Sequence, residues 1–278
     1  IANMGDGPQR VTAIAAIPIY GRSADNIRDH RNVTSMLHRI KTTDHGVLVK
    51  PTMSFDEKGH RENHRIYYVL GSAGNGEAPA AFYPTVEGFI GEGGTFLKPR
   101  AVYENAPGVP AGIRIDGREA MGGVRFPAVT VGPGETAQYT VLLGVSEDEA
   151  EIERFWAALS TPEQVKETLE RTEAHWQEKV NVRYHTGNER FDRLMRWVSF
   201  QPFLRRIYGC SFLPHHDYGR GGRGWRDLWQ DCLSLLLMDP DGVGEMMRAS
   251  FGGVRVDGTN ATIIGDGVGN FIADRNGI

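Results

Sequence analysis

One stretch of the sequence decides how the rest is interpreted: Tyr218-Gly219-Arg220-Gly221-Gly222-Arg223-Gly224-Trp225-Arg226-Asp227-Leu228-Trp229-Gln230-Asp231. Glycine lets the backbone approach a ligand, and arginine and aspartate supply directional donors and acceptors for hydroxyl groups. Tryptophan adds a flat apolar face for a sugar ring. Asp227 and Asp231 lie one helical turn apart, and Arg226 and Asp227 fall where a helix start presents unpaired N–H groups. This composition is typical of a loop that binds a sugar or an anion.

Two other interpretations of the stretch stay open at the level of composition. Residues 219–224 fit the dinucleotide-binding pattern G-x-G-x-x-G, but Pro214 and two histidines precede them, and no βαβ unit surrounds them. Alternatively, the arginines pair with Asp227 and Asp231 only to hold the start of a helix, because buried ion pairs commonly serve structure.

The segments on either side of this loop predict helices. A helix starting near Asn188 carries apolar residues on one stripe until Pro202 bends or ends it. A further helix starts near Trp225 and has almost no polar face beyond its first two turns. Helices that are apolar all round belong in the middle of a large body. We therefore expect the chain to be a fragment, cut at both ends inside a longer protein.

Residues 146–182 predict a helical linker between two larger bodies. Ser146-Glu147-Asp148-Glu149 is interpreted as a capping box, and Thr161-Pro162-Glu163-Gln164 repeats the signal with proline at the first helical position. The second helix is expected to run to about Lys179. Trp156 and Trp176 are interpreted as core residues of this linker.

The first 145 residues predict an antiparallel β-sandwich. Val11–Tyr20 and His64–Leu70 are rich in β-branched and aromatic residues, and Phe126–Val131 and Thr136–Val145 flank a turn at Gly132-Pro133-Gly134-Glu135. The chain is thus expected to be of α+β class, with a sandwich portion (1–145), a helical linker (146–182) and the beginning of a helical domain (183–278).

Composition limits the function classes. The chain has 31 Lys and Arg against 35 Asp and Glu, so it lacks the basic surplus that nucleic-acid binding requires. No apolar run approaches the roughly 20 residues that span a bilayer. Two cysteines, Cys210 and Cys232, favour a reducing compartment, which suggests a cytoplasmic protein. We expect no nucleic-acid or membrane partner and no metal.

The stretch Gly224–Asp231 resembles the G-[aromatic]-R-D-x-x-Q-D motif of glycoside hydrolase family 94, the cellobiose, cellodextrin and chitobiose phosphorylases. The helix 183–201 resembles the family's first barrel helix, and Phe89-Ile90-Gly91-Glu92-Gly93-Gly94 resembles part of its sandwich. The closing stretch, 254–276, looks more like the 1,2-β-oligoglucan phosphorylase branch. The similarity runs across essentially the whole chain, and it implies a supersandwich-like sheet domain followed by the first helices of an (α/α)6 barrel.

The resemblance also implies roles for individual residues. Asp227 and Arg220 are expected to bind the sugar on the glycosyl side of the cleaved bond. One extra residue separates them here, so Arg223 is an alternative to Arg220. Arg226 and Asp231 are expected to brace the loop, with direct sugar contact open for each, and Asp274 is expected to be a subsite residue. The general acid and the phosphate ligands are expected after Ile278, so the chain alone is expected to be inactive.

The implied reaction is the inverting phosphorolysis of β-1,2-glucooligosaccharides to α-glucose 1-phosphate, with inorganic phosphate as co-substrate and no cofactor. Alternatives within this class are cellobiose or cellodextrin phosphorolysis, or the phosphorylase-like domain of a cyclic β-1,2-glucan synthase. An alternative of another class is a non-catalytic carbohydrate-binding module. Expected partners are an oligosaccharide and the remainder of the protein or a complementary fragment; a homo-oligomer stays open.

Three polar clusters are interpreted as structural. His215-His216-Asp217 lacks a third ligand at metal spacing, Asp266 lies in a Gly-Asp-Gly turn, and Met238-Asp239-Pro240-Asp241-Gly242 ends a helix.

Overall fold

The computed structural model describes residues 1–278 except 22–30, 57–58, 209–222, 260–262, 265–270 and 273–278; for part of the rest, including the start of the helix after Gly224, it describes the backbone alone. The chain divides into two compact units, Ile1–Glu170 (the first unit) and Arg171–Ile278 (the second unit). The structure is of mixed α and β class with antiparallel strand pairing, which confirms the class predicted from the sequence. Every helix in the described ranges is too short or too polar to cross a bilayer.

The first unit is built mainly from strands. Its strands are β1 (Gln9–Val11), β2 (Ile14–Ile19), β3 (Arg39–Thr42), β4 (Gly46–Lys50), β5 (Met53–Asp56), β6 (Gly59–Glu62), β7 (Ile66–Ala73), β8 (Ala81–Thr85), β9 (Arg114–Asp116), β10 (Ala120–Arg125), β11 (Val129–Val131) and β12 (Tyr139–Ser146). Its helices are α1 (Arg31–Met36), α2 (Val86–Ile90), α3 (Arg100–Tyr103) and α4 (Glu149–Leu159). The sequence did not predict the short helices α1 to α3, because none is long enough to show a helical period.

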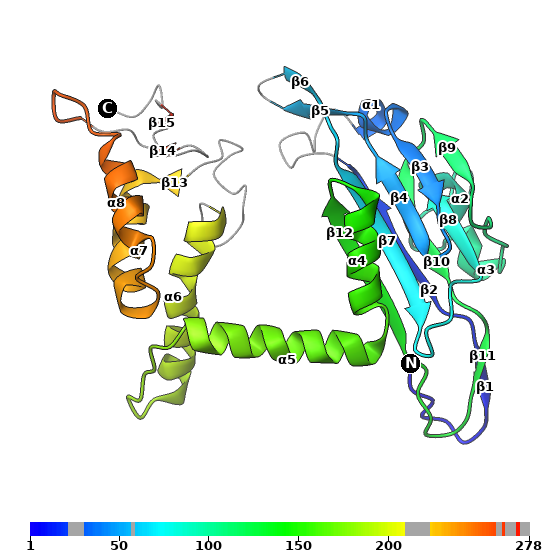
Figure 1. Ribbon diagram of the computed structural model, residues 1–278. Coiled ribbons are helices and arrows are strands. Elements are labelled where there is room, and N and C mark those ends of the chain that lie inside the picture. Colours follow the sequence, from blue (N-terminus) through cyan, green and yellow to red (C-terminus); the bar gives the residue numbers. More distant parts are fainter. Residues whose placement is uncertain (22–30, 57–58, 209–222, 260–262, 265–270, 273–278) are drawn as a thin grey trace. The chain divides into compact units, whose positions relative to one another are not determined.

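Two antiparallel sheets form the body of the first unit (Figure 1). One has the order β12-β7-β4-β3-β9 and the other the order β2-β10-β8. Alternate residues of each sheet, such as Val47 and Val69 from the first and Val124 from the second, meet in one apolar core. Gly122 is required there, because a Cβ atom at this position would lie 2.3 Å from Cγ2 of Val69 in the facing sheet.

Helix α4 packs on the outer face of the five-stranded sheet, where Ile152 and Trp156 contact Leu48 and Tyr68. The predicted capping box at Ser146 is wrong by two residues. Ser146 ends β12, and the N-cap is Asp148, whose side chain accepts a 2.7 Å hydrogen bond from the backbone N–H of Glu151. The Ser146 hydroxyl instead donates to the backbone oxygen of Asp148 at 2.9 Å. Ser146 cannot cap the helix because it is still paired with Ile66 in the sheet.

The turn at residues 132–135 is confirmed, but its flanking strands do not pair with each other. Gly134 has a φ of 75°, and Glu135 donates its N–H to the oxygen of Gly132 at 3.1 Å. Strand β11 pairs with β1, and β12 pairs with β7. The turn therefore connects different sheets. Local turn chemistry fixed the reversal, while pairing depended on residues far away in the chain.

The second unit contains α6 (Glu189–Tyr208), α7 (Trp225–Met238) and α8 (Val243–Phe251), and α5 (Pro162–Lys179) spans the division between the units. The predicted starts of α5, α6 and α7 are confirmed. Thr161 and Gln164 form the predicted reciprocal capping box, with hydrogen bonds of 3.3 and 3.1 Å. Asn188 caps α6 by accepting from the N–H of Phe191 at 3.2 Å. The sequence predicted that Pro202 would bend or end this helix; α6 continues past Pro202, so it does not end there.

The core of the second unit lies between α6, α7 and α8. Phe203, Leu235 and Val243 are buried in it, and Trp176 packs against it from the end of α5. Trp156 and Trp176, both predicted as linker core, thus belong to the cores of different units. The division between the units falls inside the segment 146–182 that was predicted as the linker.

One face of α7 stays open to solvent. Leu233, Leu236 and Leu237 follow each other at helical spacing and are 70%, 50% and 76% exposed. The opposite face carries Cys232, Leu235 and Met238, which are buried in the second unit. Helix α7 is therefore apolar on both faces, as the sequence predicted, but only one face is covered by described residues.

Candidate functional site

The start of α7 is joined to a small three-stranded sheet. Strand β13 (Arg223–Gly224) comes directly before Trp225, the first residue of α7. It pairs antiparallel with β14 (Ile263–Ile264), which pairs antiparallel with β15 (Phe271–Ile272). Arg226 and Asp227 therefore lie in the first helical turn, where backbone N–H groups have no intrahelical acceptor and the helix dipole favours negative charge.

The register of this sheet aligns two parts of the chain that are far apart in sequence. Gly224, the last residue before α7, and Ile272, the last described residue before Asp274, both lie opposite Ile263 of β14. The two residues are therefore in register across the sheet. Among the predicted site residues, Arg220 and Asp274 lie outside the described residues, as do His215, His216 and Asp266. For Arg223, Arg226 and Asp227 the structure describes the backbone alone.

Asp231 is the one predicted site residue whose side chain is described, and it is buried, with 2% of its surface exposed. Its charge acts on the neighbouring thiol. Burial is the main cause that raises the pKa of Cys232, the charge of Asp231 raises it further, and the charge of Arg206 opposes both. Asp231 thus lies on the interior side of α7, with the cation of Arg206 within electrostatic range of the same thiol.

The second tryptophan of the motif packs against a neighbouring helix. The ring of Trp229 meets the ring of Phe251 on α8 edge to face, with centroids 4.5 Å apart and planes at 77°. Trp229 therefore holds α7 against α8. The sequence alone had suggested that the tryptophans of this motif could offer a face to a sugar ring.

A charged cluster at the other end of α7 was missed by the sequence analysis. The carboxylate of Asp239 accepts hydrogen bonds from Lys179 Nζ at 3.1 Å and from Arg206 Nη1 at 2.9 Å. The hydrogen bond from Lys179 is the main cause that lowers the pKa of Asp239, and Arg206 adds to it. These bonds tie the ends of α5, α6 and α7 together. Residues 238–242 end the helix as predicted, and Gly242 has a φ of 76°. No local pattern connects Asp239 with partners 33 and 60 residues away.

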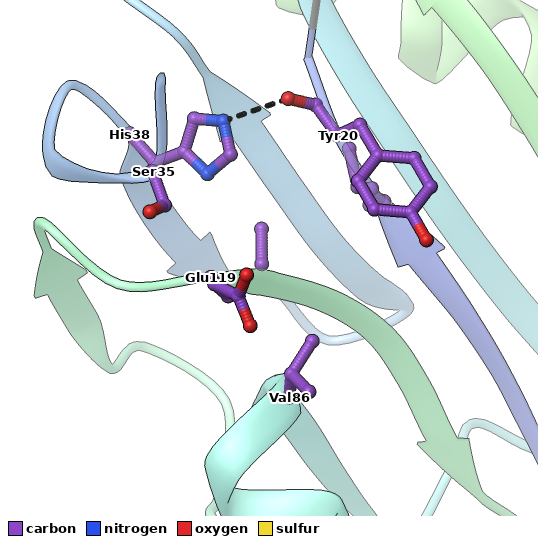
Figure 2. A pocket seen from close by; sticks show the side chains of 7 residues that line it. Tyr20, Ser35, His38, Val86 and Glu119 are labelled. Atoms are coloured by element: carbon purple, nitrogen blue, oxygen red, sulfur yellow. Dashed lines mark hydrogen bonds between the residues drawn. The ribbon is translucent and has the colours of Figure 1, made fainter. Parts of the chain in front are cut away.

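A second candidate site lies in the first unit around His38 (Figure 2). The buried imidazole fills the space between two backbone carbonyls: Nε2 is 3.1 Å from the oxygen of Tyr20, and Nδ1 is 3.2 Å from the oxygen of Arg118. Ser35, Val86 and Glu119 line a small adjoining hollow of about 10 Å³. Burial lowers the pKa of His38, while the two carbonyls and the charge of Glu119 act in the opposite direction.

His38 ties three segments together: the end of β2, the start of β3 and the connection between β9 and β10. A neutral imidazole can donate to one of its two carbonyl partners, and a protonated imidazole can donate to both. The site is therefore a structural clamp with a titratable group at its centre. No local sequence pattern marks this clamp, because Tyr20 and Arg118 are 18 and 80 residues away from His38 in the chain.

In the described ranges, no three His, Cys, Asp or Glu side chains gather in a way that could hold a metal ion. The sequence matches no model of a known protein family, and a search among curated proteins finds no similar sequence. The candidate functional site is therefore the motif Gly224–Asp231 at the start of α7, positioned by α7 and by the sheet of β13, β14 and β15.

Proposed function

We propose that this chain is part of an inverting glycoside phosphorylase that resembles those of glycoside hydrolase family 94. The observation that carries the proposal is the position of Gly224–Asp231: the glycine ends a strand, and the Arg-Asp pair occupies the first turn of the helix that follows. A carboxylate at such a helix start is held in its charged form and can accept hydrogen bonds from sugar hydroxyls.

The architecture supports the proposal at the level of domains. We interpret the two facing sheets of the first unit as part of a supersandwich, α5 as the linker helix, and α6 and α7 as the first helices of an (α/α)6 barrel. Such a barrel needs on the order of 350 residues at ordinary helix lengths, so most of it would follow Ile278. The open face of Leu233, Leu236 and Leu237 is the surface that the next barrel helices would cover.

In this proposal Asp227 and Arg220, or Arg223 in place of Arg220, hold the sugar on the glycosyl side of the bond. Arg226 and Asp231 brace the loop, and the burial of Asp231 in the second unit favours this bracing role. Asp274 is a subsite residue. It follows Ile272 by two positions, and the register of β13, β14 and β15 aligns Ile272 with Gly224.

The reaction requires one proton and one nucleophile. A protonated carboxyl group donates its proton to the glycosidic oxygen as the bond from that oxygen to the anomeric carbon breaks. A phosphate oxygen attacks the anomeric carbon from the opposite face, so a β-glucoside yields α-glucose 1-phosphate and a glucan shortened by one unit. Phosphate is already nucleophilic, so no second carboxylate is needed to activate water. The acid is proposed to follow Ile278.

The proposed substrate is a β-1,2-glucooligosaccharide, because the closing stretch 254–276 resembles the branch that acts on this linkage. Inorganic phosphate is the co-substrate, and the proposal includes no cofactor. A cytoplasmic location belongs to the same proposal, since the buried free thiol of Cys232 suits a reducing compartment.

The test is a phosphorolysis assay on the full-length protein, extended past Ile278, with β-1,2-glucooligosaccharides and cellobiose as alternative substrates. We expect product from the β-1,2-linked substrates with phosphate and none without it. Product from cellobiose alone would overturn the linkage and keep the reaction class. Binding of glucans without turnover by the full-length protein would favour a carbohydrate-binding module instead. Residues 1–278 alone are expected to show no turnover.

A further inference from the structure

A solvent-open hollow of about 450 Å³ lies on the outer face of the three-stranded sheet, between α3 and the ribbon formed by β1 and β11. Its polar lining consists of Arg10, Thr12, Asn105 and Arg125, and its remaining lining residues are small or apolar. The volume is within the range of small-molecule sites, about 300–1,000 Å³. This hollow belongs to the first unit and plays no part in the proposed reaction at α7.

The guanidinium of Arg125 is held in one orientation by three hydrogen bonds. Its Nη1 donates to the hydroxyl of Tyr83 and to the backbone oxygen of Ala106, both at 3.3 Å, and its Nη2 donates to Oδ1 of Asn105 at 2.6 Å. The Tyr83 hydroxyl itself donates to Ala106 at 2.6 Å, which fixes that partner as well. Of the five N–H groups of a guanidinium, two are therefore left for a ligand.

Asn105 is held in a conformation that serves this arrangement. Its φ of 52° is in the left-handed region, which costs energy for most residues other than glycine and is best tolerated by Asn and Asp. Asn105 follows the end of α3, and its side-chain oxygen accepts from Arg125. Its amide group keeps two N–H donors.

Arg10, the second cation in the lining of the hollow, has no acidic partner among the described residues. In the described part of the chain, the side chain of Arg10 makes no hydrogen bond and no ion pair, and none of the residues lining the hollow is acidic. A hollow on the other sheet, about 340 Å³, has four cations in its lining, but two of them are paired there with acidic lining residues: Lys41 with Glu149 and Arg39 with Asp116. The hollow with Arg10 and Arg125 thus carries two positive charges, with no carboxylate in its lining to balance them.

We infer that this hollow binds a phosphate group, either free inorganic phosphate or the phosphate of a small sugar phosphate. Two guanidinium groups match the double charge of phosphate and can each bind two of its oxygens. The Asn105 amide and the Thr12 hydroxyl provide further donors, and the small apolar lining residues leave room for an attached sugar ring. A nucleic acid does not fit the chain's net charge of −4.

The test is isothermal titration of the 278-residue chain with inorganic phosphate, α-glucose 1-phosphate and glucose at low salt. We expect saturable binding of one or both phosphates and none of glucose. Equal affinity for the two phosphates would identify free phosphate as the ligand, and tighter binding of glucose 1-phosphate would identify a sugar phosphate.

Arg10→Gln is expected to weaken phosphate binding by about tenfold, because it removes one charge-assisted contact from an exposed residue that no fold contact requires. Arg114→Gln removes the same charge from the other hollow and is expected to change the affinity by less than about twofold. Asn105→Asp keeps the left-handed conformation and the hydrogen bond to Arg125 but adds a negative charge, so it is also expected to weaken binding.

Equal loss of affinity in Arg10→Gln and Arg114→Gln would overturn the inference, because it would indicate general attraction to a charged surface. Absence of saturable binding of either phosphate would overturn it as well. Binding that is lost in Asp227→Asn and kept in Arg10→Gln would overturn the inference while supporting the phosphorylase proposal, so the two claims fail separately.

Discussion

Two carboxylates one helical turn apart on α7 have different environments. Asp231 is buried on the interior side of the helix, whereas Asp227 lies in the first turn, next to the loop that carries the glycines and arginines. Burial of an ionised carboxylate is costly unless it is paired or hydrogen-bonded, which suits a bracing role for Asp231. In the proposed function, the start of the helix, with its unpaired backbone N–H groups, is the place where a substrate hydroxyl is bound.

We predict that Asp227→Asn in the full-length protein lowers kcat/KM for phosphorolysis by about 10- to 100-fold, the equivalent of losing one hydrogen bond to a charged group. The measurement is the initial rate of glucose 1-phosphate release. Asp241→Asn makes the same chemical change at an exposed turn in the same unit and serves as the control. Unchanged turnover in Asp227→Asn would show that Asp227 does not bind the sugar.

His38 predicts a pH dependence of stability. Its folded pKa is lowered mainly by burial from the ordinary value of 6.5. Below about pH 6.5 the unfolded chain therefore binds this proton more readily than the folded chain. The contribution of His38 to stability is complete above this pH and declines as the pH falls below it.

We expect His38→Leu to lose about 1–3 kcal/mol of unfolding free energy at pH 7.5, because the backbone carbonyl that accepts from the neutral imidazole loses its donor. The variant should also lose part of the decline in stability between pH 7 and pH 5. Urea unfolding at several pH values measures both effects. His64→Leu, at a histidine with a side-chain exposure of 69%, is the control for the loss of an imidazole at an exposed position.

The side-chain interactions that the sequence could predict are those between residues within about one helical turn of each other in the chain. The predicted capping box at Thr161 and the predicted helix start near Asn188 are confirmed, and in both the capping side chain bonds a residue three positions away. The bonds of Asp239 and the clamp at His38 were not predicted, because their partners are tens of residues away and no repeated pattern marks them. The roles of Arg220 and Asp274 stay predictions, since both lie outside the described residues.

At the scale of elements, helix starts were predicted better than strand partners. The starts of α5, α6 and α7 are encoded by a few adjacent residues. Strand pairing depends on which distant strand is available: β11 and β12 follow one turn yet join different partners. Within the predicted strand Val11–Tyr20 the structure has β2 (Ile14–Ile19), which pairs with β10, whereas Val11 is the last residue of β1, which pairs with β11.

Helix α5 provides a test at this scale, because it has no buried residue and its stability is mainly local. Thr161→Ala removes the capping hydroxyl and should destabilise the helix start by about 1 kcal/mol. A loss of about 1 kcal/mol in local stability should make hydrogen exchange about fivefold faster for the amides of the first turns of α5. Thr161→Ser keeps the hydroxyl and should restore the exchange rates. Identical rates in all three proteins would contradict the capping role.

At the scale of the whole molecule, the chain is two compact units joined through α5. The sequence predicted this order of sheets followed by helices, because composition and periodicity change abruptly near Ser146. It placed α4 in the linker, however, whereas α4 packs on the sheet of the first unit. The helical spacing of Ile152 and Trp156 shows in the sequence that α4 has an apolar face. The sequence does not show that this face packs on the sheet, against Leu48 and Tyr68.

Limited proteolysis tests this division. Trypsin should cut first within α5, at Lys166 or Arg171, because these residues are exposed and the helix contributes no buried residue. The product should be a stable fragment that contains β1 to β12, detectable by mass spectrometry. Earlier cleavage at Arg125 in β10, a strand with five of its six residues buried, would contradict the assignment of this strand to the core of the first unit.

The central claim concerns the whole protein: that it transfers a glucosyl unit to phosphate with inversion. The most direct measurement is NMR of the first product formed when the full-length protein is incubated with a β-1,2-glucooligosaccharide and inorganic phosphate. The account predicts α-glucose 1-phosphate as the initial sugar phosphate, with one glucose unit removed from the glucan for each phosphate consumed. Release of free glucose with no phosphate consumed, or formation of the β-anomer, would contradict it.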